Sequence, residues 1–184
     1  ARWNAPPPGL LQRILRKPVR EPVRGLYVWG SVGRGKTYLM DLFFEALPSE
    51  RKLRMHFHRF MQRVHRELRV LAGRESPLEG VAESFAAEAD VLCFDEFFVS
   101  DIGDAMILAE LLQGLFARGV ALVATSNIEP QGLYPNGLQR RRFLPAIDLL
   151  LRHTDVHHLD GGSDYRLRAL QQADVFHFQI GRAH

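Results

Sequence analysis

The feature that most constrains the fold is a glycine-rich segment, Gly30-Ser31-Val32-Gly33-Arg34-Gly35-Lys36-Thr37. An apolar run over 25–29 precedes it, and apolar residues at helical spacing follow over 36–47. The segment fits the pattern G-x-x-x-x-G-K-[ST], which binds nucleotide phosphates when it joins a strand to a helix. With this chain's frequencies of Gly, Lys, Ser and Thr, a chance match arises in about one chain in a thousand. We therefore predict a nucleoside-triphosphate site.

Each residue type in the segment has a physical task. Glycines accept positive φ, so consecutive backbone N–H groups can point toward phosphate oxygens. The helix that follows adds the positive end of its dipole. Lys36 supplies a mobile charge for the β and γ phosphates, and the Thr37 hydroxyl can bind Mg²⁺. The residues expected to hold nucleotide are Gly30, Ser31, Val32, Gly33, Arg34, Gly35, Lys36 and Thr37.

Two acids, Asp95 and Glu96, follow a short apolar run over 91–94. Such a run is typical of a central parallel strand, and parallel strands present functional groups at their carboxyl ends. We expect Asp95 to bind Mg²⁺ through a water molecule, and Glu96 to orient and polarise the water that attacks the γ-phosphorus. Taken alone, the pair could be an acidic turn; the phosphate-loop lysine upstream favours the metal site.

Another buried strand is predicted over 120–125, and it ends in Ser126-Asn127. If this strand lies between the two strands that carry the other motifs, its tip can contact the γ-phosphate or the attacking water. Asn127 is the first choice for that role and Ser126 the second. The alternative is that Asn127 only caps the turn after the strand.

From residue 24 onward, strand and helix patterns alternate. Strands are predicted over 25–29, 52–58, 91–94, 120–125 and 155–159, and helices over 36–47, 60–71, 104–118 and 138–152. Strands separated by helices indicate an α/β fold with parallel crossovers and helices on both faces of the sheet.

The domain organisation follows from length and composition. The 184 residues suffice for one α/β domain, and five of the ten prolines fall in the first 22 residues. We predict a proline-rich arm with a short helix over 1–23, a core over 24–168 and a C-terminal remnant over 169–184. Because the chain starts without Met, we expect a fragment. Cys93 is the single cysteine, which excludes an internal disulfide and favours a reducing compartment. We find no secretory signal and no apolar run long enough to span a membrane.

Together the three motifs resemble the AAA+ ATPase core, and the connecting segments resemble the ZapE family of cell-division ATPases and its mitochondrial relatives. The matching segments are 22–27, 33–36, 55–61, 94–97 and 136–140. The resemblance implies a three-layer P-loop NTPase with a five-stranded, mostly parallel sheet in the order 5-1-4-3-2, numbered along the chain. It also implies ATP and Mg²⁺ as cofactors, ATP hydrolysis in the bacterial cytoplasm, and action on FtsZ polymers or another cell-division protein.

The same resemblance implies a ring-like homo-oligomer. Arg140, Arg141 and Arg142 open the last helix, where AAA+ proteins face the neighbouring subunit; Arg140 is favoured as an arginine finger, Arg142 is second, and Arg141 is expected to be solvated. The alternative is an ordinary basic helix start, although positive charge there is unfavourable. About 25 residues follow Leu159, too few for the usual helical lid, so we expect the lid to be absent or truncated.

Several alternatives stay open. Residues 51–74 hold eight Lys/Arg and one acid. The favoured interpretation is the solvated face of an amphipathic helix, and the alternative is a surface for nucleic acid or an acidic polymer partner. His56, His58 and His65 could suggest a metal site, but hydrogen bonding of His56 and His58 on the polar side of a strand is favoured. Peripheral membrane association is a further alternative. Other functions are a helicase-loader ATPase acting on DNA, a phosphotransferase, and an ATP-holding switch.

Overall fold

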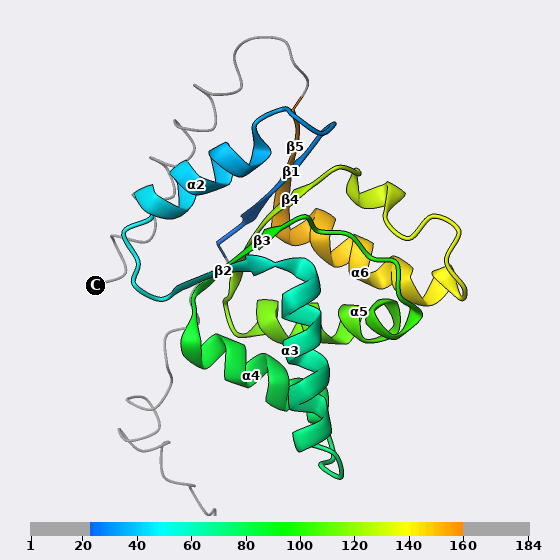
Figure 1. Cartoon of the computed structure of the whole chain (residues 1–184). Coiled ribbons are helices and arrows are strands. Elements are labelled where there is room, and N and C mark those ends of the chain that lie inside the picture. The colour runs from blue at the N-terminus through cyan, green and yellow to red at the C-terminus, as the bar shows by residue number, and fades with distance from the viewer. Residues whose placement is uncertain (1–22, 160–184) are drawn as a thin grey trace, which may run out of the picture.

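The computed structural model describes residues 23–159, and within them five parallel strands form one sheet between helices (Figure 1). The strands are β1 (Gly25–Trp29), β2 (Lys52–His56), β3 (Val91–Asp95), β4 (Ala121–Ser126) and β5 (Thr154–His158). The helices are α2 (Lys36–Ala46), α3 (Phe57–Val70), α4 (Pro77–Glu88), α5 (Ile102–Ala117) and α6 (Arg140–His153), with a 3₁₀ turn η1 (Pro130–Gly132). The order β2-β3-β4-β1-β5 confirms the predicted order, and every neighbouring pair is parallel.

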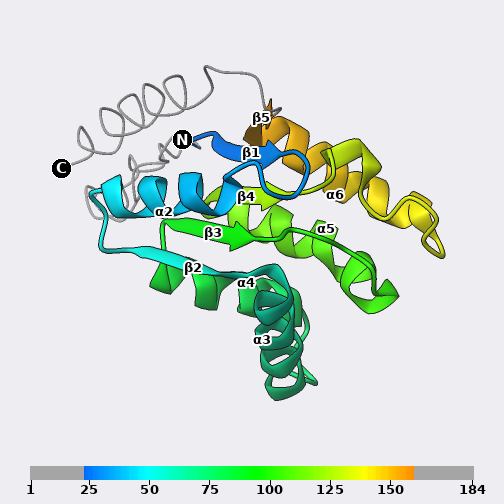
Figure 2. The same cartoon turned by 45° about the horizontal axis from the view of Figure 1, so that its top comes forward.

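Two layers of helices cover the sheet. Figures 1 and 2 show α2 on one face and α4, α5 and α6 on the other, with α3 projecting from the β2 edge. A small apolar cluster joins α2 to the sheet: Leu26, Met40, Phe43, Leu47, Val91, Cys93, Ala121 and Val123. A much larger cluster fills the space between the sheet and the other helices, and it includes Phe57, Phe60, Phe85 and Phe94. This division explains why β3 and β4 are buried along their whole length.

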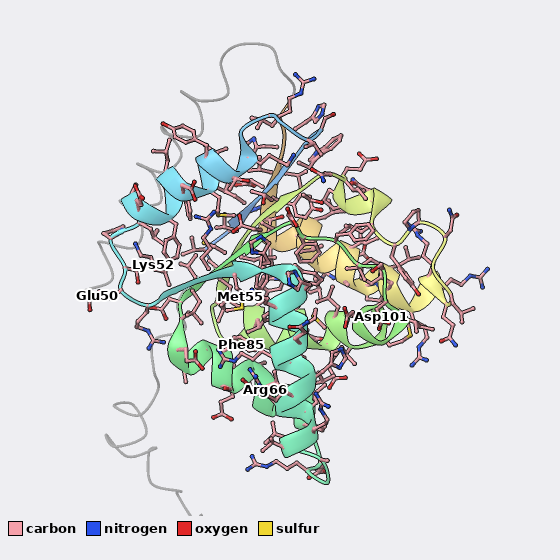
Figure 3. All side chains as sticks on the ribbon, in the orientation of Figure 1. Glu50, Lys52, Met55, Arg66, Phe85 and Asp101 are labelled. Atoms are coloured by element: carbon pink, nitrogen blue, oxygen red, sulfur yellow. The ribbon has the colours of Figure 1, made fainter. Side chains whose placement is uncertain are left out.

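Local sequence explains several of the element boundaries. The side chain of Asp101 caps α5 and accepts hydrogen bonds from the backbone N–H groups of Gly103 (2.6 Å) and Asp104 (3.2 Å). Pro77 stands in the first turn of α4, where its missing N–H has no consequence. At the packed contact of α4 with α3, the guanidinium of Arg63 lies 4.2 Å from the ring centroid of Phe85 (Figure 3 labels Phe85).

Two sequence predictions need correction. Strand β2 ends at His56 rather than at residue 58, so His58 lies exposed in the first turn of α3 and not on the polar side of a strand. The reason is Phe57, which is buried on the helical stripe that α3 packs into the core. The second correction is α4, which was not predicted although Leu78, Val81, Ala82 and Phe85 have helical spacing.

The predicted N-terminal arm, apart from residue 23, and the predicted C-terminal remnant lie outside the described residues. The expectation about the lid also falls there. No helix within residues 23–159 is long and apolar enough to cross a membrane.

Burial of Cys93 leads to a first prediction. The thiol lies in β3 under α2 with no exposed surface, and desolvation raises its pKa to about 12. Because the thiolate is the reactive form, we expect Ellman's reagent to label the native chain at neutral pH about 100-fold or more slowly than the urea-unfolded chain. Rapid, complete labelling under native conditions would contradict this placement of β3.

Candidate nucleotide site

The segment between β1 and α2 forms an exposed loop with the backbone geometry expected of a phosphate cradle. Gly33 and Gly35 have φ values of 81° and 79°, which favour glycine, and a Cβ added at either position would meet no atom within 4 Å beyond the adjacent residues. Helix α2 begins immediately after Gly35, so its first N–H groups face the same side as the loop. Residues 31–35 are exposed, and this leaves the backbone accessible to an anion.

The side chain of Lys36 folds back over this loop. Its Nζ donates hydrogen bonds to the carbonyl oxygens of Gly30 (2.5 Å) and Ser31 (2.8 Å). The residue is half-buried, and desolvation lowers the pKa of its ammonium group. The charge is therefore placed inside the loop, where phosphate oxygens are better partners for it than neutral carbonyls are.

Hydrogen bonds join the carboxyl ends of three strands beside the loop. Gly30 N–H donates to the Ser126 carbonyl (3.2 Å), and Phe97 N–H donates to the Thr125 carbonyl (2.7 Å). Strand β4 therefore lies between β1 and β3, which is the arrangement required for Asn127 to reach the site. Asn127 is exposed at this edge, whereas the Ser126 hydroxyl is buried and donates to the Phe97 carbonyl (2.8 Å). The structure thus gives Ser126 a structural task and leaves Asn127 as the candidate.

The two acids of the β3 terminus have opposite environments. Asp95 is only 7% exposed, at the last position of the strand. Glu96 is exposed and has φ 54°, in the left-handed region that non-glycine residues rarely adopt. Such a conformation costs about 1–2 kcal/mol and is often found at functional sites. It turns the chain so that Phe97 enters the core while Glu96 stays at the exposed edge.

Arg54 is a site residue that the sequence analysis did not single out. From β2 it donates to both carboxylate oxygens of Asp95, with Nε–Oδ2 at 2.8 Å and Nη2–Oδ1 at 3.3 Å. Its Nη1 donates to Asp41 of α2. The hydrogen bond to Asp95, followed by that to Asp41 and the charges of both acids, raises the pKa of Arg54 against the opposing effect of burial. One guanidinium therefore connects α2, β2 and β3.

The donor chemistry fits Mg²⁺. Thr37 offers a hydroxyl and Asp95 a carboxylate, and Mg²⁺ prefers oxygen ligands with several waters retained. The histidines are not gathered in this way: among the described residues, no three His, Cys, Asp or Glu side chains form a metal-holding group. His65 instead contacts Asp104, with Nε2 2.6 Å from Oδ1, and the rings of His56 and His58 lie 5.7 Å apart.

The three arginines at the start of α6 differ in their contacts. Arg140 is half-buried and donates to the carbonyl oxygens of Tyr134 (3.1 Å) and Gln131 (2.8 Å). Arg141 is exposed, as expected. Arg142 is exposed as well and donates to the side-chain oxygen of Gln139 at 3.2 Å. Arg140 thus stabilises the loop before α6, and Arg142 projects from the surface.

The chain is similar to proteins of one ATPase family along nearly its whole length. The model of the AFG1-like ATPase family matches residues 3–183. The chain belongs to the AFG1-like ATPase family. Cell division protein ZapE of Escherichia coli K12, one relative, is 66% identical over 155 residues, which cover 84% of this chain and 41% of ZapE. Lactation elevated protein 1 homolog B of Danio rerio is 44% identical over 168 residues, covering 85% of this chain and 33% of that protein. The chain thus spans about two fifths or less of the length of these curated relatives.

Solved structures show that this AFG1-like chain has the P-loop NTPase fold of the AAA+ type. AMPPCP-bound DnaA from Aquifex aeolicus has a TM-score of 0.54 at 18% identity, covering 85% of this chain and 46% of the DnaA chain. The DnaC helicase loader has a TM-score of 0.53 at 14% identity, covering 77% of this chain and 81% of that one. At these identities the likeness concerns the fold alone.

Proposed function

We propose that the chain is the catalytic core of a Mg²⁺-dependent ATPase that hydrolyses ATP to ADP and phosphate. One observation carries the proposal: the phosphate loop, buried Asp95 and exposed Glu96 lie at the same edge of the sheet, directly after strands that are hydrogen-bonded to one another through β4. The chain that contains them is AFG1-like. Lys36 and residues 30–37 bind the phosphates, Thr37 and Asp95 hold Mg²⁺, and Asn127 contacts the γ-phosphate or the water. When bound, the metal neutralises phosphate charge. Glu96 then orients the attacking water and accepts its proton.

We further propose that hydrolysis remodels a protein partner during cell division in the bacterial cytoplasm. The support is the 66% identity to a relative named as a cell division protein. A polymer such as FtsZ is the partner we propose, and a homo-oligomer is the working form. To act on a partner, the chain must couple ATP hydrolysis to a conformational change. The support for a homo-oligomer is Arg142, which is exposed and could contact a neighbouring subunit.

The test of the proposed function is ADP release from ATP in the presence of Mg²⁺ and without any acceptor. We expect turnover by the wild type, with a rate altered by polymerised FtsZ. Lys36→Ala should weaken ATP binding by about 10- to 100-fold, because a hydrogen bond to a charged group contributes about 1.5–3 kcal/mol. ADP formation that occurs only after a small-molecule acceptor is added, with phosphate transferred to that acceptor, would indicate a phosphotransferase instead. Tight ATP binding without turnover would indicate a switch.

A helicase-loader function remains the second candidate because of the basic segment over 51–74. The structure accounts for part of that charge: Arg63 pairs with Glu67 (2.7 Å) and Glu88, and this contact lowers the pKa of Glu88. Arg66 and Arg69 are exposed on α3. Steep salt-dependent binding of single-stranded DNA, abolished by Arg66→Ala with Arg69→Ala, would favour the loader function over the protein-remodelling one.

A further inference from the structure

Arg54 lies on the face of the sheet that α2 covers. Its register partner is Cys93, which belongs to the apolar cluster under α2. Lys52, two residues earlier on the same face, donates to the carbonyl oxygens of Phe44 (2.6 Å) and Leu47 (2.8 Å) at the end of that helix. Figure 3 labels Lys52, the first residue of β2. The Arg54 side chain is half-buried there, with 21% of its surface exposed.

The contacts of Arg54 are specific in direction. Nε and Nη2 reach the two oxygens of Asp95 as a fork, and Nη1 reaches Asp41. A fork of this kind fixes the plane of a carboxylate, which a single point charge does not. Arg54 of β2 is paired in register with Cys93 of β3, two residues before Asp95. Its side chain therefore extends toward the carboxyl end of β3 to reach the Asp95 carboxylate. Each carboxylate oxygen has a second lone pair that stays available.

The contact with Asp41 places this fork relative to the phosphate loop. Thr37 and Asp41 are four residues apart in α2, so they lie on the same side of the helix, one turn from each other. The guanidinium therefore ties the helix that carries the Thr37 hydroxyl to the strand that carries Asp95. A cation in a sheet face covered by a helix is unfavourable unless it is paired, and here both partners are acids.

We propose that Arg54 is a positioning residue for magnesium, which sets the orientation of the Asp95 carboxylate and its distance from Thr37 without touching the metal. This inference rests on the proposed ATPase function. Partners that orient a metal ligand in this way change metal affinity by about 10- to 100-fold when they are removed. We expect loss of Arg54 to lower the affinity for Mg²⁺ and not the affinity of the phosphate loop for nucleotide, because the hydrogen bonds of Arg54 go to Asp95 and Asp41 and not to residues 30–37.

The test is the coupling between Mg²⁺ and nucleotide, measured on the full chain with a fluorescent, non-hydrolysable ATP analogue. The coupling is the ratio of analogue affinities in Mg²⁺ and in EDTA. Arg54→Met should lower this ratio about tenfold and leave the affinity in EDTA unchanged. Arg54→Lys keeps the charge but loses the fork, so its ratio should fall between those of Arg54→Met and the wild type.

The matched control is Arg51→Met. Arg51 precedes β2 and pairs with Asp90 before β3 (Nε–Oδ2 3.2 Å), so it joins the same two strands at their other end. Its Mg²⁺ coupling should equal that of the wild type. Thermal unfolding of each variant accompanies the binding data, and Arg54→Lys decides the question if Arg54→Met does not fold.

The outcomes separate this inference from the function on which it rests. An unchanged or increased ratio in Arg54→Met, or full recovery in Arg54→Lys, would overturn the positioning role while the ATPase proposal stands. A wild type that binds no nucleotide, or binds it equally with and without Mg²⁺, would overturn both. A reduced ratio confined to the Arg54 variants would support the inference.

Discussion

Replacing Glu96 by Gln is expected to reduce ATP turnover by about 10²- to 10⁴-fold, because an amide cannot accept a proton from the attacking water. ATP affinity should stay within about twofold of the wild type, since the exposed Glu96 side chain lies beyond the strand end and the phosphate loop keeps its own contacts. The measurement is steady-state phosphate release together with equilibrium binding of ATP. Since Gln has the same shape, the left-handed backbone at this position is retained.

Glu110→Gln is the matched control for this experiment. Glu110 is an exposed glutamate on α5, and its replacement removes the same charge without altering the candidate site. Turnover of Glu110→Gln should match the wild type. If Glu96→Gln kept turnover within about threefold of the wild type, water activation would have to be assigned to another group.

The second large effect is expected at Arg142. An arginine that reaches the γ-phosphate of a neighbouring subunit contributes about 10³- to 10⁵-fold in rate, so Arg142→Ala should lose that factor and keep ATP affinity. Arg140→Ala should act differently, because the Arg140 guanidinium holds the backbone of Gln131 and Tyr134. We therefore expect Arg140→Ala to lower the melting temperature, and we propose Arg142 as the finger in place of the Arg140 favoured by resemblance.

A mixing experiment tests whether Arg142 acts between subunits. Lys36→Ala binds ATP poorly but retains Arg142, whereas Arg142→Ala binds ATP but lacks the finger. Each variant alone should be nearly inactive, and the mixture should recover activity that rises with protein concentration. Arg152→Ala, in the last turn of the same helix, is the control and should behave as the wild type. A wild-type rate that does not depend on concentration, with no recovery on mixing, would exclude action in trans.

Most of the architecture could be predicted because its signals are local. Periodicity and glycine spacing identified all five strands and the phosphate loop, and the position of β4 between β1 and β3 agrees with the family resemblance. The error at β2 has a physical origin: Phe57 continues the alternation of Leu53 and Met55, and it also begins the helical stripe of α3. Burial of that stripe in the larger core favours the helix.

Arg54 could not be found in this way. On an alternating strand at the sheet edge, an arginine has the pattern of a solvent-facing residue. Its actual surroundings depend on α2, which covers this face, and on Asp95, 41 residues later in the sequence. Likewise, no residue pattern predicts the left-handed backbone of Glu96, which arises because Phe97 is drawn into the core while its N–H bonds to Thr125. Both features depend on tertiary contacts.

The backbones of Gly30 and Leu159 are in close contact. A Cβ at position 30 would lie 2.4 Å from the carbonyl oxygen of Leu159, and the N–H of Leu159 donates to the carbonyl oxygen of Trp29 at 2.7 Å. The backbone of Leu159, directly after β5, therefore packs against the residue at which the phosphate loop begins. Because the two backbones are in direct contact, a displacement of Leu159 would move Gly30 with it, and we expect the geometry of the phosphate loop to change whenever the end of β5 moves.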